Sequence, residues 1–338
     1  MLETVNKSDW SVEIVPGWDR TGQAVGVVVV RAGYRFDAEG QLGHRETAIE
    51  PADRYVGDPR ETSLVAAGDG VAFKDATDCL FHGTARPLQP QATAREVRVA
   101  VAGDRDRIDK RLRVAGPRHW QATPVGLVPS RAEPLEPTPV DYTHAFGGVD
   151  IKARGMERRN PVGMGFSERR RGAKGAALPR VEYLNAPMTR WSQRPAPAAL
   201  GPLAPGWQPR RQRLDGLDYE ALADGRCPYP DPIPGRLFNV AADDQQLEQP
   251  LSGGESVYIE GMGLASRSPV RLILPGTAPV AGVATRRDAQ RVPLVCDTLI
   301  VDADAGTLDL VWRGHVTNQV TDQQKRWVVV APPKEAAA

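Results

Sequence analysis

Four residues, three aspartates and one histidine, have side chains of the types that serve as acids and bases in catalysis. Asp58, Asp78 and Asp244 supply the carboxylates, and His144 supplies the imidazole. If the fold brought two of these groups into one deep pocket, their ionisation would be perturbed and the pocket would qualify as a reaction centre. One hypothesis is therefore an enzyme, such as a hydrolase that acts on a sugar or a peptidoglycan fragment.

The local sequence favours structural roles for the same residues. Asp58 lies between glycine and proline, a pattern typical of a rigid turn whose carboxylate accepts local backbone N–H groups. Asp244 lies in the segment 243–247, which resembles a single helical turn with acidic side chains near its free N–H groups. His144 precedes a glycine-rich loop, where we expect a hydrogen-bonded structural imidazole.

The sequence contains none of the familiar cofactor or nucleophile motifs. It lacks a nucleophile elbow, a His-Glu-x-x-His pair, a phosphate-binding loop and a complete Gly-x-Gly-x-x-Gly fingerprint. Its histidines are not paired at metal-ligand spacing. We therefore predict no cofactor and no metal. We also predict reduced, structural thiols, because three widely separated cysteines make a poor disulfide framework: Cys79, Cys227 and Cys296.

The charge balance indicates which partners to expect. The chain has 43 basic and 42 acidic residues and a formal net charge of +1, so it has no general attraction to nucleic acid or to anionic membranes. Its first residues lack the pattern of a secretory signal, and no apolar run approaches the ~20 residues of a membrane span. We expect a cytoplasmic protein that binds neither nucleic acid nor membrane.

One segment departs from this balance. Basic side chains gather between residues 152 and 174, where Phe166 is a rare aromatic neighbour. A solvated loop is the simplest interpretation, contact with an acidic protein partner is the second, and phosphate binding is the third. The basic residues are Lys152, Arg154, Arg158, Arg159, Arg169, Arg170, Arg171 and Lys174.

The middle of the chain consists of short Gly- and Pro-rich motifs typical of rigid loops, which we call loop phrases. Of the 30 prolines, 18 lie between Pro124 and Pro250, and proline suits neither helix interiors nor central strands. Long loops in compact proteins are typically functional or disordered, and the recurring paired glycines and aromatics favour ordered loops. Trp191 and Trp207 lie beside several arginines, a combination typical of binding surfaces and equally of small satellite cores.

Both ends of the chain have the patterns of β-strands. Residues 25–30 form a β-branched run suited to a strand buried on both faces. Two hairpins are predicted, one from residues 96–101 and 110–114 and the other from 297–301 and 307–312. The strand at 25–30 is expected to continue through residues 31–36, which alternate as a half-exposed strand would. Further strands are expected at residues 256–260, 270–274 and 326–330, and a short helix is expected at 215–223.

These patterns predict a mainly β protein. We expect an antiparallel sandwich-like or barrel-like scaffold with a long Pro/Gly-rich ordered loop region and few short helices. The predicted order is an N-terminal β-rich part (1–123), a loop region packed on the scaffold (124–250), a C-terminal β-rich part (251–333) and a frayed tail (334–338), all in one continuous domain. The sequence leaves the strand order and the oligomeric state open.

The chain resembles a bacterial family named domain of unknown function 2169, which occurs with type VI secretion effector genes. The matching phrases follow the family order over nearly the whole chain. They are Tyr55-Val56-Gly57-Asp58-Pro59, Phe73-Lys74-Asp75-Ala76-Thr77-Asp78 with Gly83-Thr84-Ala85, Ala145-Phe146-Gly147-Gly148, Asn160-Pro161-Val162-Gly163-Met164-Gly165-Phe166, Leu178-Pro179 with Val181-Glu182, Gly201-Pro202 with Trp207 and Pro209-Arg210, Phe238-Asn239 with Asp244-Gln245-Gln246, and Leu310-Val311-Trp312-Arg313-Gly314.

The resemblance implies a cytoplasmic adaptor or chaperone. Such a protein would hold a type VI secretion effector and help to load it onto the secretion spike. The implied partner is the effector, a PAAR-repeat spike-tip protein or the valine-glycine-repeat spike protein. The family supplies no catalytic residues. An enzyme that modifies the effector is the alternative, and a structural component of the secretion apparatus is a third hypothesis.

We expect the rigid loops to form the partner-binding surface, because ordered loops lose little conformational entropy on binding. Aromatic and arginine side chains near Trp207 and Phe166 are the expected anchors. The sequence leaves open whether these residues bind a partner or stabilise the fold. The partner-binding candidates are Phe146, Gly147, Gly148, Asn160, Phe166, Trp191, Trp207, Arg210, Phe238, Asn239, Asp244, Gln245 and Gln246.

Overall fold

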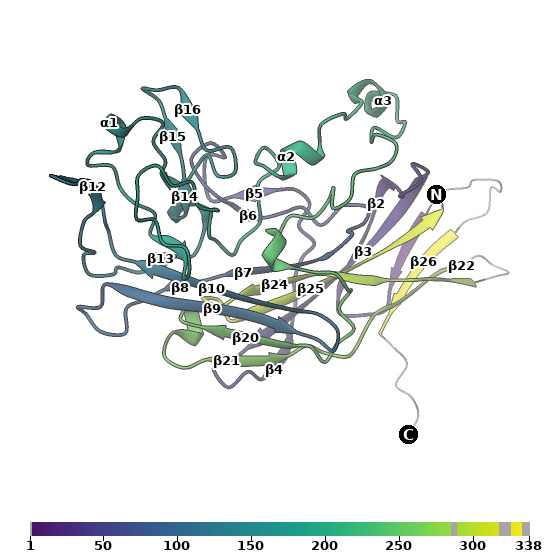
Figure 1. Cartoon of the computed structure of the whole chain (residues 1–338). Helices are drawn as coiled ribbons and strands as arrows, with labels where there is room; N and C mark the ends of the chain where they lie inside the picture. Colours follow the sequence, from purple (N-terminus) through teal and green to yellow (C-terminus); the bar gives the residue numbers. More distant parts are fainter. Residues whose placement is uncertain (1, 285–288, 318–325, 333–338) are drawn as a thin grey trace.

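The computed structural model describes residues 2–284, 289–317 and 326–332 and confirms a mainly β protein. Its large sheets are stacked, and the loops between residues 124 and 250 rise from one side of them as lobes (Figure 1). Strands from both ends of the sequence pair within the same sheets. The predicted tail at 334–338 lies outside the described residues.

A seven-stranded sheet forms the larger layer. Its strands are β2 (Ser11–Trp18), β3 (Ala24–Phe36), β4 (Leu42–Arg45), β7 (Thr77–His82), β19 (Gln246–Leu247), β24 (Val295–Asp302) and β25 (Thr307–Thr317). Their order is β19-β7-β24-β25-β3-β2, with β4 paired to β3. β7 and β24 run parallel while β24, β25 and β3 pair in antiparallel fashion, so the sheet is mixed rather than purely antiparallel.

Two further sheets complete the scaffold. The five-stranded sheet has the order β18-β10-β9-β20-β21, and the four-stranded sheet has the order β1-β26-β22-β23. The first contains β9 (Ala94–Ala102), β10 (Arg107–Ala115), β18 (Val181–Tyr183), β20 (Ser256–Glu260) and β21 (Val270–Ile273). The second contains β1 (Leu2–Asn6), β22 (Val280–Ala284), β23 (Ala289–Val292) and β26 (Arg326–Ala331).

The main core lies between these sheets and draws on all three of them. Val28 and Val30 of β3 face this core, whereas Val27 and Val29 enter a second cluster with Val311. β3 is therefore buried on both faces, as its β-branched run predicted. Both predicted hairpins form, β9 with β10 and β24 with β25. The arrangement is sandwich-like, and the described strands do not close into a barrel.

Short pairs of strands and single helical turns organise the remaining chain. The strands are β5 (Arg54–Tyr55), β6 (Leu64–Ala66), β8 (Thr84–Ala85), β11 (Trp120–Thr123), β12 (Gly126–Pro129), β13 (Thr138–Pro139), β14 (Phe146–Gly147), β15 (Val149–Asp150), β16 (Gly155–Met156) and β17 (Met164–Gly165). The α-helices are α1 (Arg170–Ala173), α2 (Arg210–Arg213) and α3 (Tyr219–Ala223). The 3₁₀ turns are η1 (Tyr142–His144), η2 (Asp243–Gln245) and η3 (Gly263–Ser266).

Two helical predictions need correction. The helix expected at 215–223 begins only at Tyr219, because the Asp218 carboxylate accepts the backbone N–H of Ala221 (2.9 Å) and sets the N-terminus there. The turn η2 exists, but its acidic side chains do not cap it. Asp243 and Asp244 instead pair with basic side chains outside the turn.

Candidate functional site

Buried side-chain amides hold the loop phrases against one another. The Nδ2 atom of the buried Asn160 donates to the carbonyl oxygens of Tyr142 (2.7 Å) and Phe146 (3.0 Å). Gly147 approaches Asn160 so closely that a Cβ at this position would overlap the Asn160 carbonyl oxygen. Only glycine fits there, and β14 and β17 pair beside it.

Gln245 links the loop at Leu200 to strands β7 and β10. Its Nε2 atom donates to the carbonyl oxygens of Cys79 (2.9 Å) and Leu200 (2.7 Å), and its Oε1 atom accepts from Nζ of Lys110 (2.9 Å). Buried backbone carbonyls need hydrogen-bond partners, and these side-chain amides supply some of them. The side-chain amides of Asn160 and Gln245 are therefore internal hydrogen-bonding groups of the fold.

Asp78, a candidate catalytic acid, belongs to this internal network. It is fully buried and accepts hydrogen bonds from Asn239 Nδ2 (3.0 Å) and from the backbone N–H groups of Val240 (3.0 Å) and Ala241 (3.1 Å). It also pairs with Lys74 (2.7 Å). Burial acts to raise the pKa of this carboxyl, but Lys74 and the hydrogen bonds outweigh burial and lower the pKa. An ionised Asp78 fixes the neighbouring loop.

The other residues proposed for catalysis lie apart. Asp58 is exposed, and its carboxylate accepts the backbone N–H of Arg60 (2.8 Å), which is the local turn that the sequence indicated. Nδ1 of His144 lies 2.7 Å from Oδ1 of Asp141. Of the four candidates, Asp244 alone lines the Tyr142 pocket defined below, and none lines the pocket beside Arg31. The structure does not bring them together at either pocket.

Most of the partner-binding candidates lie inside the protein. The exposed one is Asp244. The partly buried ones are Phe166, Trp191, Arg210 and Phe238. The buried ones are Phe146, Gly147, Gly148, Asn160, Trp207, Asn239, Gln245 and Gln246.

Trp207 belongs to a satellite core rather than to the surface. Its side chain is 4% exposed and meets Tyr142 edge-to-face, with ring centroids 5.4 Å apart. Leu64 and Leu203 pack in the same cluster. This burial favours the satellite-core interpretation of the tryptophan over a role as a binding anchor. Phe166 is also covered, because the guanidinium of Arg194 lies over its ring (5.0 Å).

An open pocket of about 340 Å³ lies where these loops meet, and we call it the Tyr142 pocket. Its lining is mostly apolar: Tyr142, Tyr183, Ala196, Pro197, Leu203, Pro209 and Ala242, with Arg159, Gln208, Asp243 and Asp244 as polar neighbours.

Charged and phenolic groups are fixed at one side of this pocket. Asp244 accepts from Nζ of Lys110 (2.9 Å) and from the Tyr183 hydroxyl (2.8 Å). Burial lowers the pKa of Lys110 against the opposing effect of Asp244. Burial also raises the pKa of Tyr142 and of Tyr183, so both phenols remain protonated donors at neutral pH. The buried Tyr142 hydroxyl has no hydrogen-bond partner among the described residues.

A family model described as an uncharacterized protein conserved in bacteria, DUF2169, matches residues 21–313. The chain belongs to this family. The match spans β3, all the loop phrases that form the Tyr142 pocket, and β25 as far as Arg313. No curated protein and no solved structure matches the chain significantly.

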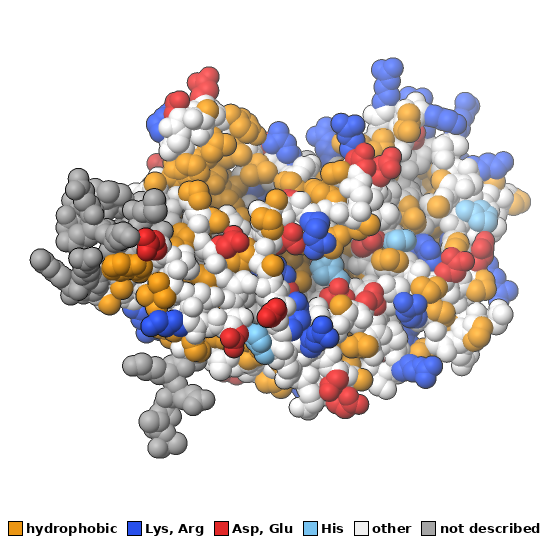
Figure 2. Space-filling model, turned by 180° about the vertical axis from the view of Figure 1, so that it is seen from behind, with side chains coloured by type: hydrophobic (Ala, Val, Ile, Leu, Met, Phe, Trp, Pro, Cys, Tyr) orange, Lys and Arg blue, Asp and Glu red, His pale blue; other side chains and the backbone are white. Residues whose placement is uncertain are grey.

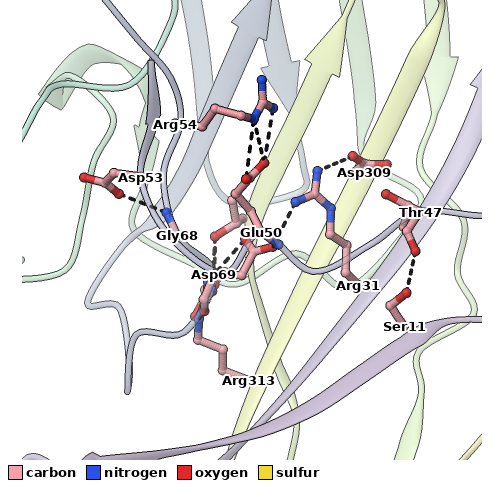
Figure 3. Close-up of polar contacts among 12 residues, drawn as sticks. Ser11, Arg31, Thr47, Glu50, Asp53, Arg54, Gly68, Asp69, Asp309 and Arg313 are labelled. Atoms are coloured by element: carbon pink, nitrogen blue, oxygen red, sulfur yellow. Dashed lines mark hydrogen bonds and ion pairs between the residues drawn. The ribbon is translucent and has the colours of Figure 1, made fainter. Parts of the chain in front are cut away.

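In this DUF2169 member, a buried ionic network that the sequence analysis missed lies on the loop-covered face of the seven-stranded sheet. Arg31 of β3 donates to Asp69 (2.8 Å) and to Asp309 (2.5 Å) (Figure 3). Arg45 also pairs with Asp309. Arg313 donates to the backbone carbonyl of Asp69 through Nε (3.1 Å) and Nη2 (3.0 Å). Burial acts to lower the pKa of Arg31, but the two carboxylates outweigh it and raise the pKa.

A pocket of about 370 Å³ lies beside this network. Its charged lining is balanced, with four cations and four carboxylates, so these residues give it no net formal charge. Burial lowers the pKa of His82, which is therefore neutral at pH 7. The charged residues are Arg31, Arg45, Arg54 and Lys74, opposed by Glu50, Asp69, Asp302 and Asp309.

A weak sequence signal for this network did exist. Arg31 and Asp309 interrupt apolar strands with charges of opposite sign, and both occupy the face that contains Val29 and Val311. They are 278 residues apart in sequence, so neither segment alone indicates the pairing.

The described residues contain no group of three or more His, Cys, Asp or Glu side chains that could hold a metal ion. Cys79, Cys227 and Cys296 are all free thiols. In the part of the chain that the structure describes, no helix has the length and apolar character needed to cross a membrane.

Proposed function

We propose that this protein is an adaptor that binds a partner protein at the surface around the Tyr142 pocket. The pocket carries the proposal, because several loop phrases converge there on an open and mostly apolar hollow. Its proline and alanine walls have little rotamer freedom to lose. A rigid apolar surface of this kind loses little conformational entropy when it binds a partner.

The polar groups at the pocket suit a segment of polypeptide. The buried Tyr142 hydroxyl has no partner among the described residues, and an unsatisfied buried donor is costly until it is paired. Arg159, Gln208 and Asp244 surround the apolar walls with groups that bond to backbone or polar side chains. An apolar centre with a polar rim is the usual composition of a protein–protein interface.

The family resemblance supports a type VI secretion effector as the partner. A PAAR-repeat spike-tip protein and the valine-glycine-repeat spike protein are the other candidates. In this proposal the protein acts as a chaperone in the cytoplasm and loads the effector onto the spike. The buried amide network supports this role, because it holds long loops in one conformation before the partner arrives.

The test is affinity capture of the tagged protein from its native bacterium, with the retained proteins identified by mass spectrometry. Wild type is expected to retain an effector or a spike protein. Ala196→Trp fills the pocket from an exposed position and is expected to reduce this capture at least about tenfold, a change of ~1.4 kcal/mol in binding.

The matched control is Ala223→Trp, which adds the same bulk at an exposed position on α3. It is expected to retain the partner at the wild-type level. Equal capture by wild type and Ala196→Trp would remove the Tyr142 pocket from the proposal. Turnover of a small molecule, with no effector or spike protein retained by wild type, would contradict the adaptor function itself.

A further inference from the structure

A second surface is formed by residues 149–174, which we call the basic lobe. β15 and β16 form a hairpin in which Val149 lies opposite Met156. The carboxylate of Asp150 accepts the backbone N–H of Glu168 (3.1 Å), which holds the segment that leads into α1 against this hairpin. The basic side chains of the hairpin and of α1 therefore belong to one surface.

The basic lobe concentrates positive charge in a nearly neutral chain. It contains eight Lys or Arg and three Asp or Glu residues, a formal charge of +5, whereas the whole chain has +1. Two of its carboxylates are satisfied internally, since Asp150 accepts backbone N–H groups and Glu157 pairs with Arg159 (2.8 Å). The remaining cations are exposed and have no ion pair with any described residue: Lys152, Arg154, Arg158, Arg169, Arg170, Arg171 and Lys174.

Apolar side chains lie exposed among these cations. Val149 is 54% exposed, Ile151 is 84% exposed and Met156 is 49% exposed. In Figure 2, two raised lobes flank a hollow at the top of the molecule, and Lys and Arg side chains gather on the right-hand lobe. That lobe carries α1, β15 and β16 in Figure 1. Exposed aliphatic side chains within a charged rim mark a docking surface.

We propose that the basic lobe docks an acidic surface of the partner protein, with Val149, Ile151 and Met156 as apolar anchors. This inference rests on the proposed function, because it takes the partner to be a protein. Carboxylates of the partner would neutralise cations that otherwise repel one another. The lobe is continuous with the Tyr142 pocket through Arg159, which belongs to the lobe and lines the pocket.

Nucleic acid and a membrane surface fit the lobe less well. Surfaces that bind single strands interleave aromatic side chains with cations, but Phe166 is the lobe's one aromatic residue and Arg194 covers its ring. Interfacial membrane anchors use an amphipathic helix with a broad apolar face. The helix of this lobe, α1, spans four residues and buries its one apolar side chain, Ala173.

The experiment measures fluorescence anisotropy of a labelled glutamate-rich peptide with a central leucine-phenylalanine pair, added to the full-length protein. The lobe is altered in two ways, by Ile151→Asp alone and by reversing three cations together: Arg169→Glu, Arg170→Glu and Arg171→Glu. The matched controls are Leu88→Asp and the reversal of three exposed arginines elsewhere: Arg60→Glu, Arg105→Glu and Arg267→Glu. Circular dichroism checks that each variant is folded.

Each lobe variant is expected to weaken binding of the acidic peptide at least about tenfold, while the controls change it less than about twofold. Binding is also expected to weaken when NaCl rises from about 50 to about 300 mM, because exposed charges are screened. Equal affinities for the lobe and control variants would overturn the inference. Tighter binding of wild type to an oligothymidine strand or to phosphatidylglycerol vesicles than to the peptide would overturn it as well.

The capture experiment separates this inference from the proposed function. If the reversed-charge lobe variant retains the effector or spike protein while Ala196→Trp loses it, the lobe inference fails and the adaptor function stands. If wild type retains no such protein, the adaptor function fails whatever the peptide does.

Discussion

Gln245→Met tests whether the buried side-chain amide of Gln245 stabilises the fold or contacts a partner. Methionine keeps the length and flexibility of glutamine and removes both polar atoms. The substitution deletes two hydrogen bonds to the carbonyl oxygens of Cys79 and Leu200 and one bond from the Lys110 ammonium. Because Gln245 is fully buried, water cannot replace these bonds without opening the loops.

The expected cost follows from those three bonds. Each bond to a neutral carbonyl contributes about 1 kcal/mol, and a bond to a charged donor contributes about 1.5–3 kcal/mol. The free energy of unfolding should therefore fall by about 4 kcal/mol. With an unfolding entropy of about 2.1 cal/mol/K per residue over 338 residues, this corresponds to a decrease in Tm of about 6 °C.

Urea denaturation and calorimetry measure both quantities on the purified protein. Gln249→Met makes the same chemical change at an exposed position and should alter stability by less than about 0.5 kcal/mol. A Gln245→Met protein as stable as wild type that has nonetheless lost its partner in affinity capture would contradict this structural role of Gln245. It would show that Gln245 is a contact residue.

Three further substitutions test the structural roles of Trp207, Gly147 and Asp78. Trp207→Ala should lower the free energy of unfolding measured in urea by about 3–5 kcal/mol, because it leaves a cavity in a satellite core. Unchanged stability would instead support Trp207 as a binding anchor. Gly147→Ala should cost about 1–3 kcal/mol by the same measurement, and Gly206→Ala, where a Cβ meets open space, should not. Asp78→Asn should cost about 3–5 kcal/mol at pH 7, because it leaves Lys74 buried without its charged partner. The folded pKa of Asp78 lies below the unfolded value of 3.8, so its stabilisation is complete above that value and is lost as the pH falls through the folded pKa. Urea titrations across that range should show the difference between wild type and variant shrinking, and a constant difference would contradict this role.

The sequence predicted those elements whose information is local. β9 and β10 alternate apolar and polar residues around a tight turn, β24 and β25 are rich in strand-forming residues around another, and both pairs form the expected hairpins. The parallel pairing of β7 with β24 joins segments more than two hundred residues apart, so no local pattern specifies it. For the same reason, the sequence could not predict that the large sheet mixes parallel and antiparallel strands.

The site was less predictable because buried residues in irregular structure follow no periodic pattern in the sequence. Asn160 and Gln245 lie among glycines and prolines as exposed loop residues do, yet each satisfies backbone carbonyls inside the protein. Trp207 had two equal interpretations, and only its neighbours Tyr142 and Leu203 decide between them. The charge of the basic lobe was visible in the sequence, but the exposed aliphatic Ile151 gained meaning only beside it.

Amide hydrogen exchange of the purified protein measures how rigidly the long loops are held. We infer that buried side chains fix the long loops as rigidly as the sheets beneath them. The backbone N–H groups of Gly148, Met164, Leu200 and Leu203, all bonded to loop carbonyls, should then exchange as slowly as those of β9 and β10. Exchange of these four amides at the rate of an unstructured peptide, with the strands still protected, would show that the loops are not held rigidly.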